Sequence, residues 1–253
     1  MRAVFSRNED LLKSELDSLY AQFNNRQYLQ YDPIRYVHEF EDHTEMELAG
    51  MLCSALSFGR VTQIFKAIEA VLKIVEGRPL EYVLNLKNRP DRNLLSFKYR
   101  FVTGNDVFNL FISANKIMEA HGSIGNFVMA NYCRGNLLGL VDAITRAFRG
   151  VNYLVPSSLK ASPCKRLFMF LRWMVRKDNI DIGLWDFISP KELVIPLDTH
   201  IFRVSKELGF TSKKAPSLNA AIEITDSLKR FCKEDPVKYD WALSHIGIIE
   251  NNF

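Results

Sequence analysis

The chain has 253 residues, of which 33 are Lys or Arg and 29 are Asp or Glu, and its formal net charge is +4 at neutral pH. Apolar residues make up 47% of the sequence and charged residues 25%, values that exclude a disordered, collagenous or low-complexity protein. The sequence has no apolar run of the length that a signal peptide or a membrane span needs, so we expect a cytoplasmic protein without a membrane partner.

Apolar residues recur every three or four positions through most of the chain, as they do on one face of an amphipathic helix. Alternating apolar patterns never continue beyond a few positions, which makes a sheet-based core unlikely to form. We therefore expect an all-α fold, a two-lobed helical bundle. The expected helices, in chain order, span 8–23, 33–40, 44–58, 61–76, 106–121, 123–132, 137–148, 164–176, 199–208, 218–231 and 236–246.

Prolines at 156 and 163 mark the clearest break in this pattern. We expect one domain with three approximate parts: a helical body at 1–150, a basic segment at 151–214 and C-terminal helices at 215–253. The formal charges of these parts are +1, +5 and −2. The basic middle suits a polyanionic partner such as nucleic acid, while a merely solvated face is the alternative. Its basic residues include Lys160, Lys165, Arg166, Arg172, Arg176, Lys177, Arg203, Lys206, Lys213 and Lys214.

The sequence offers no convincing set of metal ligands. Its four cysteines, at positions 53, 133, 164 and 232, form no CxxC pair, so we expect reduced thiols and no iron–sulfur cluster. His38 and His43 lie five positions apart and miss the four-residue spacing of helical zinc ligands. We expect no metal and no cofactor.

The sharpest local pattern is PLDTHIFRV at 196–204, in which Asp198 follows a proline and opens a helix. A carboxylate at that position accepts backbone N–H bonds and favours the positive end of the helix dipole. Capping alone would explain an aspartate there, and a catalytic role is the alternative.

This segment resembles the one that carries the catalytic aspartate in the helix-hairpin-helix DNA glycosylase superfamily, the group of endonuclease III and adenine glycosylase. In members that also cleave the DNA backbone, the upstream hairpin supplies a catalytic lysine at the start of the next helix. Here SPCKRLFMFLR places Lys165 in the first turn of a helix, 33 residues before Asp198. The long intervening stretch looks like that of archaeal 8-oxoguanine glycosylases. As a whole, the chain also resembles an uncharacterised bacterial family, DUF2400, usually described as glycosylase-like.

The resemblance implies a monomeric DNA repair enzyme that removes an oxidised purine from double-stranded DNA through a lysine Schiff base. Lys165 would be the nucleophile, and Asp198 would stabilise the cationic transition state and orient or deprotonate the amine. A nucleophilic amine must be neutral, and both the helix N-terminus and Arg166 disfavour a further cation at Lys165. The alternative is a helical nucleic-acid-binding protein that keeps the glycosylase architecture without its chemistry.

The hairpin departs from the family pattern, because LKASPC at 159–164 lacks the usual Gly-x-Gly turn whose amides reach a DNA phosphate. The resemblance assigns contacts with the DNA backbone to Lys160, Ser162, Arg166 and Arg203.

Five further residues are candidates for the base pocket or for the gap that a flipped base leaves. The LCSALS stretch at 52–57 resembles the LLSAQ helix of endonuclease III, with Leu56 in place of the gap-filling glutamine and Arg60 one turn beyond. Leu56 would act as an apolar wedge and Arg60 would reach the opposite base or a phosphate. Phe168 would stack on the flipped base, and Asp240 beside Trp241 would offer an acceptor and a stacking face. The alternatives are core positions for Leu56, Phe168 and Trp241, and surface positions for the other two.

Overall fold

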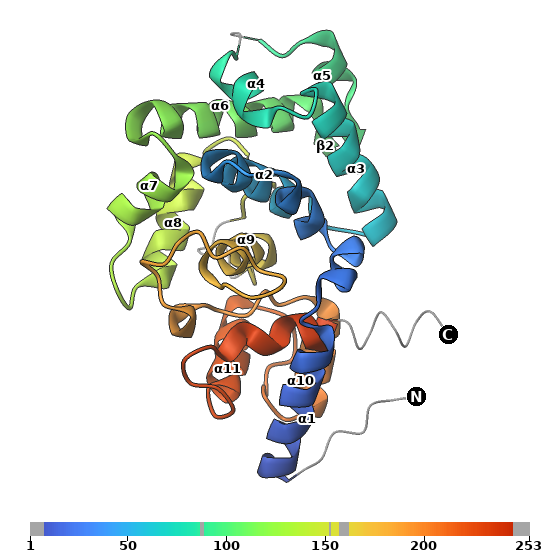
Figure 1. Ribbon diagram of the computed structural model, residues 1–253, viewed down its shortest axis with the longest axis vertical. Helices are drawn as coiled ribbons and strands as arrows, with labels where there is room; N and C mark the ends of the chain where they lie inside the picture. Colours follow the sequence, from blue (N-terminus) through green and yellow to red (C-terminus); the bar gives the residue numbers. More distant parts are fainter. Residues whose placement is uncertain (1–7, 87–88, 152, 157–161, 245–253) are drawn as a thin grey trace. The chain divides into compact units, whose positions relative to one another are not determined.

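The fold is mostly helical, with a single two-stranded antiparallel sheet among the residues described, so the expected all-α class is confirmed (Figure 1). The chain forms two compact units. The central unit is Gln30–Leu159, and the terminal unit joins Met1–Leu29 to Lys160–Phe253. The first helix thus groups with the C-terminal part, unlike the three-part division expected from composition. The computed structural model describes residues 8–86, 89–151, 153–156 and 162–244.

Helix α2 organises the central unit. It packs against the 3-10 helix η2 and against helices α3, α4 and α7, and all of its residues from Glu47 onward are buried. The elements of this unit are η2 (Pro33–Glu39), α2 (His43–Leu56), α3 (Val61–Ile74), α4 (Pro79–Leu84), α5 (Arg92–Ser96), β1 (Lys98–Tyr99), β2 (Val102–Thr103), α6 (Gly104–His121), α7 (Ile124–Asn131) and α8 (Leu137–Ala147).

Local sequence signals account for the ends of these helices. The side chain of Asp42 accepts the backbone N–H of Glu45 at the start of α2. After α3, Gly77 takes a left-handed backbone with φ of 70° and donates its N–H to the carbonyl of Leu72. Glycine tolerates that conformation because it has no Cβ. The helix stop expected at Glu76-Gly77 is therefore confirmed.

Helix α9 belongs to the terminal unit, and its residues from Leu167 to Val175 are all buried. The 3-10 helix η5 packs against α1, α11 and η4. The elements of this unit are α1 (Glu9–Phe23), α9 (Lys165–Val175), η4 (Pro190–Glu192), α10 (Thr199–Glu207), α11 (Leu218–Leu228) and η5 (Pro236–Tyr239), and η1 (Arg26–Tyr31) crosses the sequence boundary between the units.

The structure differs from the expected helices in three places. The segment expected as a helix at 33–40 is the 3-10 helix η2. It ends at Glu39, and the N–H of the next residue, Phe40, donates to the Val37 carbonyl. The segment at 236–246 begins as η5 and is helical at 240–244, and its last two residues lie outside the described part. Short α4, α5 and the β1–β2 hairpin were not expected, because segments this short carry too little periodicity to be recognised.

Candidate active site at the starts of two helices

Asp198 is the N-cap of α10. Its backbone is extended, and its Oδ1 accepts the N–H of Ile201 at 2.8 Å. The preceding Pro196 and Leu197 are buried and hold the chain at this point. The capping role expected for Asp198 is therefore present in the structure.

Lys165 is the first residue of α9, and the side chain of its N-cap residue, Cys164, makes no capping hydrogen bond. The preceding Cys164 is buried and takes a left-handed backbone, with φ of 47°. Such a conformation ordinarily favours glycine, and a side chain there costs on the order of 1 kcal/mol. Cys164 thus has a backbone conformation typical of glycine, directly before the candidate nucleophile.

The two candidate catalytic side chains lie together. The Nζ of Lys165 is 3.4 Å from Oδ2 of Asp198, and the two side chains are 35% and 32% exposed. The two oxygens of the Asp198 carboxylate have different partners, since Oδ1 caps α10 and Oδ2 faces the lysine. Capping and a role in chemistry are therefore compatible for this aspartate. The pair is partly exposed, and its separation is that of an ion pair.

A buried ion pair lies close to this site. Arg172, two turns along α9 from Lys165, donates to Asp240 and also to Asp181 at 3.2 Å. Burial raises the pKa of Asp240 to about 6, with Arg172 opposing the rise and Asp198 adding to it. The Oδ1 of Asp240 is buried and has no hydrogen-bond partner among the residues described. Asp240 is thus electrostatically linked to the Lys165–Asp198 pair.

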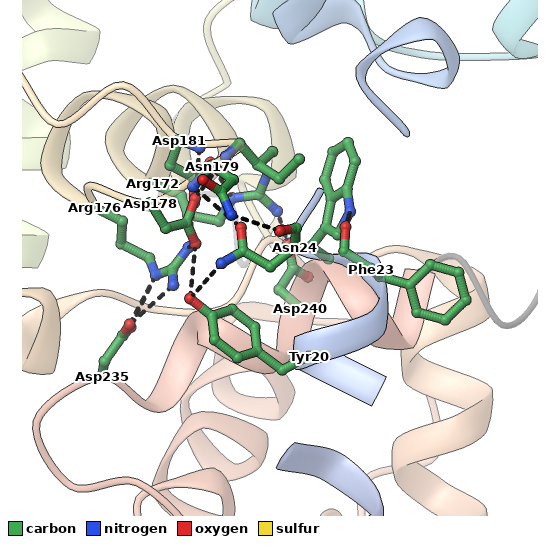
Figure 2. A network of polar contacts seen from close by, with 12 residues as sticks. Tyr20, Phe23, Asn24, Arg172, Arg176, Asp178, Asn179, Asp181, Asp235 and Asp240 are labelled. Carbon is green, nitrogen blue, oxygen red and sulfur yellow. Dashed lines mark hydrogen bonds and ion pairs between the residues drawn. The ribbon is translucent and has the colours of Figure 1, made fainter. Parts of the chain in front are cut away.

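The network continues through Arg176, which follows α9 (Figure 2). Its guanidinium donates to Asp181, and to Asp235 at 2.9 Å, and it lies 2.9 Å from Asp178. Burial opposes the charge of Arg176, yet these three carboxylates hold its pKa above the ordinary arginine value. Burial raises the pKa of Asp181 despite both arginines. The network fastens the C-terminal end of α9 to the loop that follows it.

Helix α1 joins the same network, as Figure 2 shows. The hydroxyl of Tyr20 donates to Asp178 at 3.1 Å and accepts from Asn24. The side-chain amide of Asn179 donates to the Asn24 carbonyl at 2.8 Å. Segments that are distant in sequence thereby hold α9 in place. From the sequence, Arg172 and Arg176 were treated only as part of a basic excess. Arg172 lies within the apolar run of α9 and Arg176 directly follows it, which was the signal that both are buried.

The structure corrects three of the expected base contacts, all in the terminal unit. Phe168 is 1% exposed and lies in the core. Trp241 is buried, and its Nε1 donates to the Phe23 carbonyl at 2.9 Å. Asp240, a candidate acceptor for the base with a surface position as the alternative, is instead buried against Arg172. Because they are buried, these side chains offer no open face to a base. Helix periodicity indicates an apolar stripe but not which of its residues are covered, so the sequence could not decide this.

Leu56 and Arg60 belong to the central unit. Leu56 is fully buried at the end of α2, so the expected apolar wedge is also corrected, in favour of the core alternative. Arg60 is exposed and is the N-cap residue of α3, where its side chain makes no capping bond.

The residues expected at the DNA backbone have different surroundings. Lys160 lies outside the described residues. The Ser162 hydroxyl accepts the N–H of Cys164 at 3.2 Å, and Arg166 is half-buried. Arg203 is exposed on α10, where its guanidinium meets Nδ1 of His200 at 3.2 Å. The other ring nitrogen of His200 bonds to the Leu243 carbonyl at 3.2 Å.

Within the described ranges, no group of three or more His, Cys, Asp or Glu side chains is arranged to hold a metal ion. The helices of those ranges include none that is both long and apolar enough to cross a membrane.

In comparison with known proteins, residues 32–249 match one family model, whose description is "Protein of unknown function (DUF2400)". No curated protein and no solved structure matches the chain. The matched range includes both Lys165 and Asp198.

Proposed function

We propose that this chain, which belongs to the DUF2400 family of proteins of unknown function, is a DNA glycosylase with lyase activity that acts on an oxidised purine in double-stranded DNA. The observation that supports the proposal is the accessible pair of Lys165 and Asp198, 3.4 Å apart at the starts of α9 and α10. The resemblance of the motifs around both residues to those of DNA glycosylases supports the same assignment.

The chemistry begins with the amine. Asp198 takes a proton from Lys165 on its Oδ2, which leaves a lone pair on Nζ. That lone pair attacks the sugar C1′, the bond from C1′ to the base breaks, and its electrons leave with the base, which takes up a proton. The proton that Asp198 accepted passes to the departing base, so the carboxylate is anionic again and stabilises the positive charge that develops on the sugar.

The covalent intermediate then opens. The bond from C1′ to the ring oxygen breaks to give an iminium ion, and the oxygen is protonated. Loss of a proton from C2′ pushes electrons toward C3′ and expels the 3′ phosphate. Water finally hydrolyses the Schiff base and restores the Lys165 amine. The base and the cleaved strand are the products.

Exposed positive charge on the terminal unit is available for DNA. Arg172 and Arg176 form buried ion pairs. The positive charge that this segment exposes at the surface is therefore smaller than its count of basic residues suggests. Arg203 and Lys206 on α10 are exposed beside the site. These charges suit binding to phosphates without sequence preference.

The test is borohydride trapping on a panel of duplexes, each with one oxidised purine, because borohydride reduces a Schiff base to a stable protein–DNA adduct. We expect an adduct and strand cleavage with the wild type. Lys165→Gln should abolish both while it leaves folding and DNA affinity nearly unchanged, because it removes the nucleophile and keeps most of the side-chain volume. Lys177→Gln, at an exposed lysine just after α9, is the matched control. Trapping by Lys165→Gln, or no wild-type adduct on any lesion, would refute the proposal.

The second candidate is an inactive nucleic-acid-binding protein with the same architecture. The hairpin sequence at 159–164 favours it, because it lacks the glycines whose amides approach a phosphate. Duplex binding without an adduct on any lesion in the same experiment identifies this function.

A further inference from the structure

Three aromatic rings form an exposed cluster on the central unit. The ring of Tyr153 meets Phe58 and Phe101 edge to face, with centroids 5.2 and 5.1 Å apart. Phe58 and Phe101 are nearly parallel, at 7°, with centroids 6.5 Å apart. Phe101 is 64% exposed and Tyr153 is 45% exposed. Large apolar side chains gathered at a surface mark an interaction site more often than scattered ones do.

An arginine lies over this cluster. The guanidinium carbon of Arg100 is 5.3 Å from the Phe101 ring centroid and 5.8 Å from that of Phe58. Gly59 lets it approach, since a Cβ on Gly59 would lie 2.7 Å from Arg100 Nη1. The cluster therefore combines ring faces with a fixed positive charge.

The backbone that presents these side chains is strained and well anchored. Arg100 and Phe101 form the two-residue turn between β1 and β2, and Arg100 has a φ of 55°. A left-handed arginine costs on the order of 1 kcal/mol, and strain of this kind concentrates at functional sites. The buried Tyr99 donates its hydroxyl to the Phe58 carbonyl, which ties the hairpin to the segment after α2.

We infer that Phe58, Arg100, Phe101 and Tyr153 form a stacking platform for unpaired bases of a nucleic acid strand. Aromatic faces stack on any base, and an arginine beside them contacts the phosphates, so the combination suits single-stranded segments without a fixed sequence. Arg60 and Lys98, which are near these residues in sequence, are exposed and add positive charge. This charge suits a nucleic acid strand, whereas an apolar protein surface would not require it. The inference rests on the proposed function only for the class of partner, nucleic acid.

A tryptophan reporter tests the stacking directly. The three tryptophans of the chain, Trp173, Trp185 and Trp241, are all buried, so Phe101→Trp creates a tryptophan that is distinguishable by its exposure. In the full-length protein we expect an oligothymidylate to quench the added emission, because a base stacks on the indole. An abasic strand of the same length should not quench it. Equal emission with and without saturating oligothymidylate would overturn the platform.

Affinity measurements separate stacking from charge. We expect Phe101→Ala to weaken oligothymidylate binding about tenfold and to leave binding of the abasic strand unchanged. Tyr153→Ala is a second variant with the same expected pattern, and Phe101→Trp should restore affinity. Leu84→Ala, at another exposed apolar residue of the central unit, should bind like the wild type.

The remaining outcomes also decide the question. Equal losses for both strands, or no loss for either aromatic variant, would overturn the platform. A change in oligomeric state of Phe101→Ala with unchanged binding would assign the cluster to protein contact instead. Lys165→Gln should bind oligothymidylate like the wild type. Base-dependent binding without any trapped adduct would thus refute the proposed chemistry and leave the platform standing.

Discussion

At the scale of single residues, Asp198 combines two tasks that can be separated by substitution. Asparagine caps a helix about as well as aspartate but cannot accept a proton from Lys165. We expect Asp198→Asn to lower the trapping rate about a hundredfold or more, as loss of a general base does, while the free energy of unfolding changes by less than about 1 kcal/mol.

Asp198→Ala is the companion variant. It removes both the cap and the base, so it should lose the same activity and also about 1 kcal/mol of stability. Trapping kinetics and thermal unfolding measure the two effects. An Asp198→Asn variant that traps DNA at the wild-type rate would leave the aspartate with capping alone.

The raised pKa of Asp240 predicts that the stability of the protein depends on pH. Its pKa in the folded protein is about 6, above the ordinary value of 3.8, because burial outweighs the pull of Arg172. A group of this kind contributes stability that is complete below its unfolded pKa and is lost as the pH rises through the folded value. The free energy of unfolding of the wild type, relative to Asp240→Asn, should therefore fall by about 3 kcal/mol between about pH 4 and about pH 7.

Urea unfolding at several pH values measures this difference. Only its change with pH is diagnostic, because Asp240→Asn also leaves Arg172 with one fewer charged partner. Asp226→Asn, at an exposed residue of α11, is the control and should run parallel to the wild type. Parallel profiles for Asp240→Asn would contradict the assigned shift.

At the scale of elements, the contact between α5 and α6 depends on one glycine. A Cβ on Gly104, the first residue of α6, would lie 1.7 Å from the carbonyl oxygen of Leu94 in α5. Alanine ordinarily stabilises a helix relative to glycine, but here the overlap is with backbone that has no rotamer to change. We expect Gly104→Ala to destabilise the protein by about 2 to 3 kcal/mol.

Gly77→Ala is the matched control for this prediction. Gly77 has a left-handed backbone but no neighbouring atom within 4 Å of its Cβ position, so alanine should cost only about 1 kcal/mol. Urea denaturation followed by circular dichroism compares the two variants. If Gly104→Ala proves the more stable of them, the close approach of α5 and α6 is not as described.

At the scale of the whole molecule, charge governs how the chain would meet DNA. The net charge is only +4, and two of the basic residues in the terminal unit are neutralised inside it. We expect duplex affinity to fall steeply with salt. Each of Arg203→Ala and Lys206→Ala should reduce the slope of log K against log salt concentration by about 0.9, the value for one released phosphate contact.

Fluorescence anisotropy on an undamaged duplex at several salt concentrations measures these slopes. Lys116→Ala removes an exposed charge on α6, outside the basic segment, and should leave the slope unchanged. Identical slopes for all variants would remove α10 from the DNA-binding surface.

Sequence alone determined the helical class of this protein and most of its long helices, because periodicity and capping act between residues a few positions apart. The stripe at 106–121 predicted α6, Glu76-Gly77 predicted the stop after α3, and the proline and aspartate at 196 and 198 predicted the start of α10. The candidate pair of Lys165 and Asp198 was also found in the sequence, from motif resemblance and from placement at helix starts.

Only the tertiary structure decided which side chains are covered and which ones meet. Arg172 reaches Asp240 across 68 positions, and Leu56 turns its side chain into the core. A helix can rotate about its axis without changing its local pattern, so packing between distant segments determines these outcomes. The same holds for the aromatic cluster, whose rings come from three separate segments. Cys164 has a left-handed backbone, which a residue with a side chain ordinarily avoids. Such a conformation persists only where the surrounding structure imposes it.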